Sequence, residues 1–375
     1  MKNNYKLKDL VNIKAGQLIN KKYIDNNIGV YPVINSGIEP LGYINKYNTE
    51  NNSIGITTRG ANVGTILWTE GKYFRGNLNY GLTIKDKSIL NERFLYHLLL
   101  NSEKQIKSKC NFSGIPALNL SNLENIILTI PSLEEQENIV KVLDTLTTYK
   151  DTLKDTLKDT LKDTRKQYEY YLNELMTFGE DEIDYFELKD IFDLRNGYTP
   201  SKKEPSFWKN GEIPWFRMED LRKSGSILSD SIQKVHRSGV KGKLFKKDTI
   251  IMATTATIGE HAIVTVDYLS NQRFTNFSLK EKFVNRLDMK FVYYYFFIVD
   301  EFAKKNTQTS GFPSVNMKSL KKLNFPIPSL EKQKEIVSVL DNFYKLTNDL
   351  SSGLPLQIEL VEKQYQYYRN QLLSF

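Results

Sequence analysis

The stretch IPSLEEQENIVKVLD (residues 130–144) returns as IPSLEKQKEIVSVLD (residues 327–341), with 11 of 15 positions identical. The same offset of 197 residues links SGIP at 113–116 with SGFP at 310–313, and KQYEYY at 166–171 with KQYQYY at 363–368. An offset that stays constant over this span indicates a duplicated unit rather than chance similarity, and its length excludes a solenoid repeat. The chain is therefore predicted to contain two copies of one structural unit.

Both copies of this stretch are predicted to begin a helix. Ser132 is a good N-cap, and Glu135 three residues later completes a capping box. Ile139 and Leu143 then follow the helical period of a buried stripe. In the second copy Ser329 keeps the cap, but Lys332 replaces the glutamate.

The two helical segments differ in their middle. In the first copy LKDT occurs three times, at residues 153–156, 157–160 and 161–164, which predicts one long helix to residue 178. In the second copy SSGLP at residues 351–355 contains a Gly-then-Pro stop signal. The second copy is therefore predicted to be two helices joined by a turn.

The remaining segments alternate short apolar runs with Gly and Asn turns, which is typical of strands. Each also carries a predicted helix, at residues 91–101 and 287–300. The second such segment is 16 residues longer than the first. The predicted fold class is α+β with an internal pseudo-two-fold duplication. The chain is predicted to contain four regions, which are a strand-rich domain at 1–130, a helical region at 131–178, a second strand-rich domain at 179–327 and a second helical region at 328–375.

Charge is distributed unevenly over these four regions. The net charge of +8 divides into +7 for residues 1–130, −3 for 131–178, +5 for 179–327 and −1 for 328–375. Two basic modules suggest a polyanion that is touched in two places. Ordinary solubility charge remains the alternative.

Several function classes lack their motifs. No Walker loop, Rossmann glycine fingerprint or adjacent prolines of an amino-methyltransferase motif occur, and His97, His236 and His261 lack partners at metal-ligand spacing. We therefore expect a binding protein without catalytic residues, metal or bound cofactor. The single Cys110, the charged N-terminus and the absence of a long apolar run predict a cytoplasmic protein.

The order of basic region, PSLEEQ-type capped helix, second basic region and second capped helix resembles the specificity subunits of type I restriction-modification systems. GYTPS at 197–201 with IPWF at 213–216, and YPV at 31–33 with GYI at 42–44, resemble openings of that family's target-recognition domains. The resemblance implies two target-recognition domains that each read half of a bipartite site in double-stranded DNA. It also implies that the helical regions pair as an antiparallel coiled coil.

The resemblance also implies partners. Two methyltransferase subunits would carry S-adenosylmethionine and methylate adenine at N6, and motor-nuclease subunits using ATP and Mg would join for restriction. The family usually has a Gly-Leu-Pro turn in both helical regions, and this chain has the LKDT run in the first.

Base reading requires side chains with two hydrogen-bonding functions held on loops over a rigid sheet. Residues 57–64 align with 252–259, and residues 75–80 with 272–277, as two such stretches in each module. The predicted DNA-binding residues are Arg59, Asn62, Arg75, Asn77 and Asn79 in the first module, and Thr255, Thr257, Gln272, Arg273 and Asn276 in the second, with Lys241, Lys243, Lys246 and Lys247 as phosphate contacts. Turn capping is the alternative role for each.

The helical regions supply the predicted spacer and subunit interface, with these residues: Leu143, Leu146, Leu153, Leu157, Leu161, Tyr168, Tyr171, Leu340, Tyr365 and Tyr368. One LKDT unit adds about 6 Å to a helix, and DNA advances about 3.4 Å per base pair. Our hypothesis is that the number of units sets the gap between half-sites. The alternative is a solvated helix whose leucines pack inward. A self-contained enzyme and a coiled-coil scaffold for proteins are the rival functions.

Overall fold

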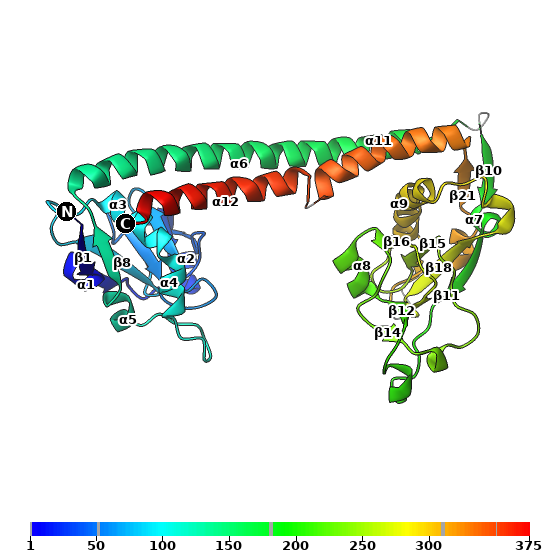
Figure 1. The fold of residues 1–375 in the computed structure, drawn as a ribbon, viewed down its shortest axis with the longest axis horizontal. Helices are drawn as coiled ribbons and strands as arrows, with labels where there is room; N and C mark the ends of the chain where they lie inside the picture. The colour runs from blue at the N-terminus through cyan, green and yellow to red at the C-terminus, as the bar shows by residue number, and fades with distance from the viewer. Residues whose placement is uncertain (1, 51–52, 180–182, 309–311, 350) are drawn as a thin grey trace. The chain divides into compact units, whose positions relative to one another are not determined.

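The computed structural model describes residues 2–50, 53–179, 183–308, 312–349 and 351–375. Its backbone divides into two compact units (Figure 1): a first unit of residues 1–158 with 357–375, and a second unit of residues 159–356. The helical segments predicted at 131–178 and 328–375 are each divided between these two units. Residues 310 and 311 of the repeated SGFP stretch lie outside the described residues.

The first unit is built on a four-stranded sheet of order β2-β8-β5-β6, with a three-stranded sheet β4-β3-β7 and a pair β1-β9. Its elements are β1 (Asn3–Lys6), α1 (Leu7–Leu10), β2 (Val11–Ala15), α2 (Lys21–Asn26), β3 (Ile28–Ile34), β4 (Tyr43–Ile44), β5 (Ser53–Thr57), β6 (Ile66–Thr69), β7 (Phe74–Arg75), β8 (Asn79–Ile84), α3 (Glu92–Asn101), α4 (Glu103–Ser108), α5 (Leu120–Glu124) and β9 (Ile127–Ile130).

The second unit has a five-stranded sheet β11-β18-β15-β16-β13, a three-stranded sheet β14-β12-β17, and the pairs β10-β21 and β19-β20. Its elements are β10 (Asp184–Glu187), α7 (Leu188–Ile191), β11 (Phe192–Asn196), β12 (Ile213–Phe216), α8 (Met218–Ser224), β13 (Ile227–Leu228), β14 (Lys234–Val235), β15 (Thr249–Ala253), β16 (His261–Val264), β17 (Leu269–Ser270), β18 (Phe274–Leu279), α9 (Met289–Lys305), β19 (Thr307–Gln308), β20 (Ser314–Val315), α10 (Met317–Leu320) and β21 (Asn324–Ile327), with short 3-10 turns at Pro205–Phe207, Arg237–Gly239 and Glu281–Phe283.

The two units repeat one topology, so the duplication predicted from sequence is confirmed. Strands β2, β8, β5 and β6 correspond in order to β11, β18, β15 and β16, and β4-β3-β7 corresponds to β14-β12-β17. The second unit adds α8 and β13 between β12 and β14, where the first unit passes directly from β3 to β4.

The predicted helices form because each has a cap and an apolar face. Asn91 caps α3 by accepting the Phe94 N–H at 3.0 Å, and Asp288 caps α9 in the same way. The face formed by Phe94, Leu95, Leu98 and Leu99 is buried in the core of the first unit. Helix α9 extends to Lys305, beyond the predicted end at residue 300, because its apolar positions continue to Ala303.

The long helical segments follow the sequence prediction, except that the first ends at residue 175 and not at 178 (Figure 1). Helix α6 (Leu133–Leu175) is continuous over 43 residues, whereas α11 (Leu330–Asn348) and α12 (Leu354–Leu373) are separate helices. The turn between them requires Gly353, because a Cβ there would lie 2.6 Å from the Lys345 carbonyl oxygen. Ser132 and Ser329 cap α6 and α11 by accepting backbone N–H groups at 3.3 and 3.2 Å.

Within each unit two of these helices run antiparallel. In the first unit Thr147 donates to the Tyr365 hydroxyl at 3.0 Å, and Lys154 lies 2.8 Å from Glu362, so residue numbers rise along α6 as they fall along α12. In the second unit the Tyr171 ring stacks on Phe343 of α11 with centroids 5.4 Å apart. The chain leaving α6 enters β10, which pairs with β21 just before α11 begins, so the end of α6 lies near the start of α11. The predicted antiparallel pairing is thus present in both units.

Candidate nucleic-acid interface

Each unit carries a loop at the end of its central strand, which we call the strand-end loop: residues 58–64 after β5 and residues 254–259 after β15. Its backbone bonds to a neighbouring segment, the flanking loop, which comprises residues 111–117 in the first unit and residues 312–315 in the second. Gly60 N–H donates to Pro116 O, and Ala256 N–H donates to Pro313 O, both at 2.9 Å. Gly60 and Ala256 both have positive φ, 93° and 69°. The two strand-end loops are therefore structurally equivalent.

A second loop lies beside the strand-end loop in each unit. This pre-strand turn comprises residues 76–78 before β8 and residues 271–273 before β18. Thr58 N–H donates to Leu78 O, and Thr254 N–H donates to Arg273 O, both at 2.9 Å. The two loops of each unit therefore form one continuous surface at one end of the sheet.

These hydrogen bonds correct the register predicted from sequence. The strand-end loops match at an offset of 196 at Thr58 and 195 from Gly64, and the pre-strand turns match at 195 rather than 197. Insertions within loops shift the offset, and the repeated helical motif carries no information about them. In the corrected register Arg59 matches Thr255, and Asn77 matches Gln272. Asn62 and Thr257 lie where the offset changes from 196 to 195, so they share a loop but are not a matched pair.

Six predicted residues of these loops, together with Arg273, remain available at this surface. Arg59, Gln272 and Arg273 are exposed, whereas Asn62, Asn77, Thr255 and Thr257 are half-buried. Asn62 donates to Ser36 O at 3.2 Å, which leaves its carbonyl oxygen available. Gln272 accepts a hydrogen bond from the Thr199 hydroxyl.

Arg75 does not belong to this surface, so its predicted DNA-reading role is corrected. The residue is 6% exposed, and its guanidinium donates to Ile54 O, Asn79 Oδ1 and Tyr80 O at 2.7–3.2 Å. Burial lowers the pKa of Arg75 below its usual value. Its guanidinium crosses Gly81, where a Cβ would lie 2.7 Å from the guanidinium carbon. Arg75 therefore stabilises the sheet.

Asn79 and Asn276 are also fully buried, and the same correction applies to them. Asn276 accepts from the hydroxyls of Tyr268 and Ser270 at 2.9 Å and donates to Arg195 O at 2.8 Å. By register Asn276 stands where the first unit has Gly81, and Ser270 stands where it has Arg75. The two units fill one buried polar space with different residue pairs.

The second unit has a basic hollow of about 480 Å³ beside its pre-strand turn. Its lining includes the predicted residues Thr257, Gln272 and Arg273. Sequence reasoning missed the other polar and charged side chains of this lining, which are Thr199, Lys202, Arg217, Arg222, Asn271 and the one acidic residue, Glu219. Arg217 directly follows the quoted IPWF stretch, which was the available signal.

The lysines predicted to contact phosphates in the second unit differ in whether a carboxylate of the protein already pairs with them. Lys241 and Lys243 are exposed. The Lys241 backbone N–H donates to the Tyr198 hydroxyl at 2.7 Å, which holds this loop near the start of the unit. Lys246 instead forms an ion pair with Asp267 at 2.8 Å, and the Lys247 N–H donates to the same carboxylate. Lys246 therefore offers less free charge to a phosphate.

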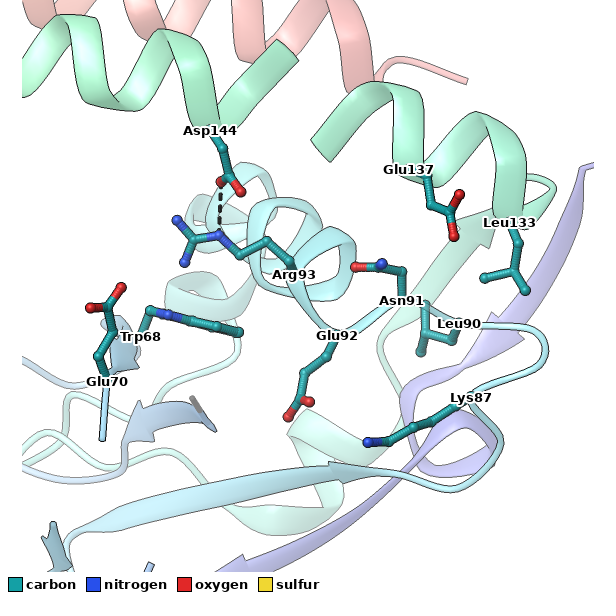
Figure 2. Close-up of a pocket in the computed structure, with 10 residues that line it drawn as sticks. All are labelled: Trp68, Glu70, Lys87, Leu90, Asn91, Glu92, Arg93, Leu133, Glu137 and Asp144. Carbon is teal, nitrogen blue, oxygen red and sulfur yellow. Dashed lines mark hydrogen bonds and ion pairs between the residues drawn. The ribbon is translucent and has the colours of Figure 1, made fainter. Parts of the chain in front are cut away.

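A polar hollow of about 620 Å³ lies where α3 meets the start of α6 in the first unit (Figure 2). Arg93 extends across it, donating from Nε to Asp144 at 2.8 Å while its guanidinium lies 4.6 Å from the Trp68 ring centroid. His97 lies 2.8 Å from the same carboxylate oxygen. The buried Gln136 on α6 accepts the Asn91 N–H at 2.8 Å. We call these contacts the domain–helix clamp.

The second unit repeats the domain–helix clamp with exchanged residues. Gln333 accepts the Asp288 N–H at 2.8 Å, and Asp341 accepts from the Tyr294 hydroxyl at 2.6 Å and from Lys290. The offset is 197 throughout, the same as in the helical repeat. The clamp fixes each strand-rich domain to its own helix. It therefore positions the strand-end loop and the pre-strand turn without forming part of them.

The predicted spacer residues fall into two classes. The first class forms the apolar stripe. Three of its residues are buried, namely Leu143, Leu340 and Tyr365, and five are half-buried, namely Leu146, Leu153, Leu157, Leu161 and Tyr168. The LKDT leucines therefore face inward while the Asp and Thr residues between them are mostly exposed. Tyr171 and Tyr368, one from each copy, are exposed.

No group of three or more His, Cys, Asp and Glu side chains in the described ranges could hold a metal ion. Among the helices the structure describes, none is both long and apolar enough to cross a bilayer.

A family model described as the type I restriction modification DNA specificity domain matches residues 2–163 and 180–360. The specificity subunit of the Escherichia coli type I restriction enzyme EcoprrI is 48% identical over 213 residues, covering 55% of this chain and 53% of that protein. A putative type I specificity subunit of Mycoplasma pneumoniae is 30% identical over 380 residues, covering 99% and 97%. The chain thus spans about half the length of the Escherichia coli relative and nearly all of the Mycoplasma pneumoniae relative.

Two solved structures share the fold. A chain from a study of "complex assembly and conformational transition of the type I R-M system" has a TM-score of 0.72 at 14% identity, covering 99% of this chain and 97% of that chain. The HsdS subunit from Thermoanaerobacter tengcongensis has a TM-score of 0.59 at 14% identity, covering 100% and 95%.

Proposed function

The chain belongs to the family of type I restriction-modification specificity subunits, and we propose that it selects the DNA sequence on which a methylation and restriction complex acts. Each strand-rich domain would read one half of a bipartite site in double-stranded DNA. The chain itself would supply recognition and no catalytic group.

The matched loops carry this proposal. Two copies of one sheet present the pairs Arg59/Thr255 and Asn77/Gln272 at equivalent positions, with different residue types in each copy. Arg can bond bidentately to guanine, and Asn and Gln to adenine. One scaffold with two different sets of readers is suited to two different half-sites. The basic excess of both domains supports the attraction of phosphates.

The partners follow from the family. Assembly with other subunits is the family's mode of action, and we propose two methyltransferase subunits and motor-nuclease subunits as those partners. S-adenosylmethionine would bind to the methyltransferases, and ATP and Mg to the motor-nuclease, so this chain would hold no cofactor. The exposed Tyr171 and Tyr368 are candidate parts of the subunit interface. The cytoplasm, where host DNA is accessible, is the proposed location.

Long-read detection of methyladenine in host DNA tests the proposal, with the gene intact and deleted. We expect a bipartite motif that disappears on deletion, because target choice depends on this chain. If methylation is unchanged while the methyltransferase is expressed, the proposal is wrong. Salt-dependent DNA affinity in the presence of the methyltransferase separates the proposal from the rival protein scaffold, which would bind DNA weakly at every salt concentration.

A further inference from the structure

Each unit exposes a large apolar side chain directly before a proline of the flanking loop, and in the first unit Phe112 of the same loop is exposed as well. Ile115 is 73% exposed and Phe312 is 81% exposed. Both directly precede a proline, Pro116 and Pro313, and both stand at the offset of 197. A single exposed apolar residue needs no explanation. An exposed apolar residue at the same position of both copies, beside loops that are otherwise polar, does require an explanation.

In the first unit the backbone holds Ile115 beside the strand-end loop. Asn111 and Ala117 exchange N–H to carbonyl hydrogen bonds of 2.8 and 3.0 Å, which close the flanking loop into a hairpin. Ala117 forms a β-bridge with Arg59. The Ser113 N–H and hydroxyl both donate to the Asn111 side chain, at 2.8 and 2.7 Å. The hairpin tip is therefore ordered where it meets the candidate base reader.

The second unit anchors the residues after Phe312 in the same way. Val315 N–H donates to Thr254 O at 2.9 Å, matching the bond from Leu118 to Thr58 in the first unit. Ser314 forms the β-bridge with Thr255. Phe312 is therefore two residues from a direct backbone contact with a candidate reader.

We propose that Ile115 and Phe312 are DNA-contacting residues that make apolar contact with the bases of their half-sites. The inference rests on the proposed function and deepens it. Proteins that deform DNA place exposed Phe, Leu, Ile or Met side chains against base steps, and the thymine methyl group is a further apolar partner. The base step and the thymine methyl group are both apolar surfaces. A phosphate offers no such surface.

The contact has a signature that separates it from a charge contact. Removing a lysine or arginine that neutralises a phosphate lowers the slope of affinity against salt concentration. Removing an uncharged tip weakens binding equally at low and high salt. The salt slope therefore reports whether Ile115 acts itself or only positions the charge of Arg59. In the second unit it reports the same for Phe312 and the charge of Arg273, because Thr255 is uncharged.

The test uses the full chain assembled with its methyltransferase, and a duplex carrying the methylated motif. Ile115→Thr is compared with Ile127→Thr, the same change at an exposed residue of β9, on another sheet of the unit. Phe312→Ser is compared with Val284→Ser, an exposed residue after β18. We expect about tenfold weaker binding for each tip variant, equivalent to about 1.4 kcal/mol, with an unchanged salt slope. Phe312→Leu should retain binding.

Four outcomes are decisive. Failure of the wild-type complex to bind the duplex overturns the proposed function and this inference with it. Wild-type binding with tip variants that match their controls overturns the inference alone. A tip variant with a reduced salt slope also overturns it, because the loss then comes from a displaced charge. Loss at constant slope supports it, and 2-aminopurine or uracil placed in each half-site then identifies a base face or a thymine methyl as the contact.

Discussion

The carboxylate of Asp144 lies 2.8 Å from Nε2 of the fully buried His97. Because a carboxylate only accepts hydrogen bonds, Nε2 carries the proton. The other ring nitrogen, Nδ1, has no hydrogen-bond partner among the described residues. In the second unit Tyr294 takes the position of His97 and bonds to Asp341. One copy of the domain–helix clamp therefore contains an imidazole where the other contains a phenol.

His97 should make the first unit acid-sensitive. Burial lowers the pKa of His97 below its usual 6.5, against the opposing effect of Asp144. The unfolded chain binds the proton as the pH falls through about 6.5, whereas the folded state binds it only at lower pH, so stability is lost as the pH falls below that value. We expect wild-type protein to lose more unfolding free energy than His97→Gln between about pH 7.5 and about pH 5.5. An equal loss of unfolding free energy in the two proteins over this pH range would contradict the prediction. His236 and His261 are present in both proteins, so they cannot cause a difference between them.

The two carboxylates of the clamp, Asp144 and Asp341, should contribute equally to the unfolding free energy. Asp144→Ala removes the acceptor of Arg93 and His97, and Asp341→Ala removes the acceptor of Lys290 and Tyr294. We expect each to cost about 1.5 kcal/mol of unfolding free energy in urea denaturation. Asp155→Ala is the control, because its ion pair with Lys158 is exposed and worth about 0.5 kcal/mol or less. Equal effects of all three changes would rule out the clamp.

The amide of Gln272 should read a base of one half-site. Gln272→Ala removes a side chain that can bond bidentately to adenine, so discrimination at one base pair should fall by about 1–3 kcal/mol. We expect the methylated motif to become degenerate at one position of one half-site. The control is Asn77→Ala, its partner in the first unit, which should relax the other half-site only. Degeneracy in both half-sites from one substitution would contradict separate readers.

Lys241 should contribute affinity without sequence choice. Its charge is exposed, whereas Lys246 is paired with Asp267. Lys241→Ala should weaken binding to specific and nonspecific duplexes alike and reduce the salt slope by about 1. Lys246→Ala should change the slope less, because Asp267 already offsets its charge. A changed methylation motif in Lys241→Ala would show that it reads bases.

The LKDT run should set the gap between half-sites. One unit inserted after residue 164 lengthens a helix by about 6 Å and turns its end by about 40°. We expect long-read sequencing to show a motif whose half-sites are unchanged and whose gap differs by about one or two base pairs. Lys158→Arg, which keeps the length, is the control. An unchanged gap would leave the inward packing of Leu153, Leu157 and Leu161 as the sole role of the repeat.

The sequence by itself determined the duplication, the capped starts at Ser132 and Ser329, the unbroken α6 and the break before α12. These features depend on neighbours within one or two helical turns, so local spacing, caps and the Gly-Pro signal suffice to predict them. The family resemblance followed from the same stretches, because they recur at one offset.

Only the tertiary structure decided which polar residues face outward. Arg75, Asn79 and Asn276 have the chemistry of base readers, yet they are buried because residues far along the chain, such as Ile54 and Arg195, supply their hydrogen-bond partners. The loop offsets of 195 and 196 also became visible only in the structure, because insertions within loops shift the offset and only the hydrogen bonds between strands and loops locate them. A polar side chain looks the same in sequence whether it satisfies a buried carbonyl or awaits a ligand, and only the positions of distant backbone groups distinguish the two.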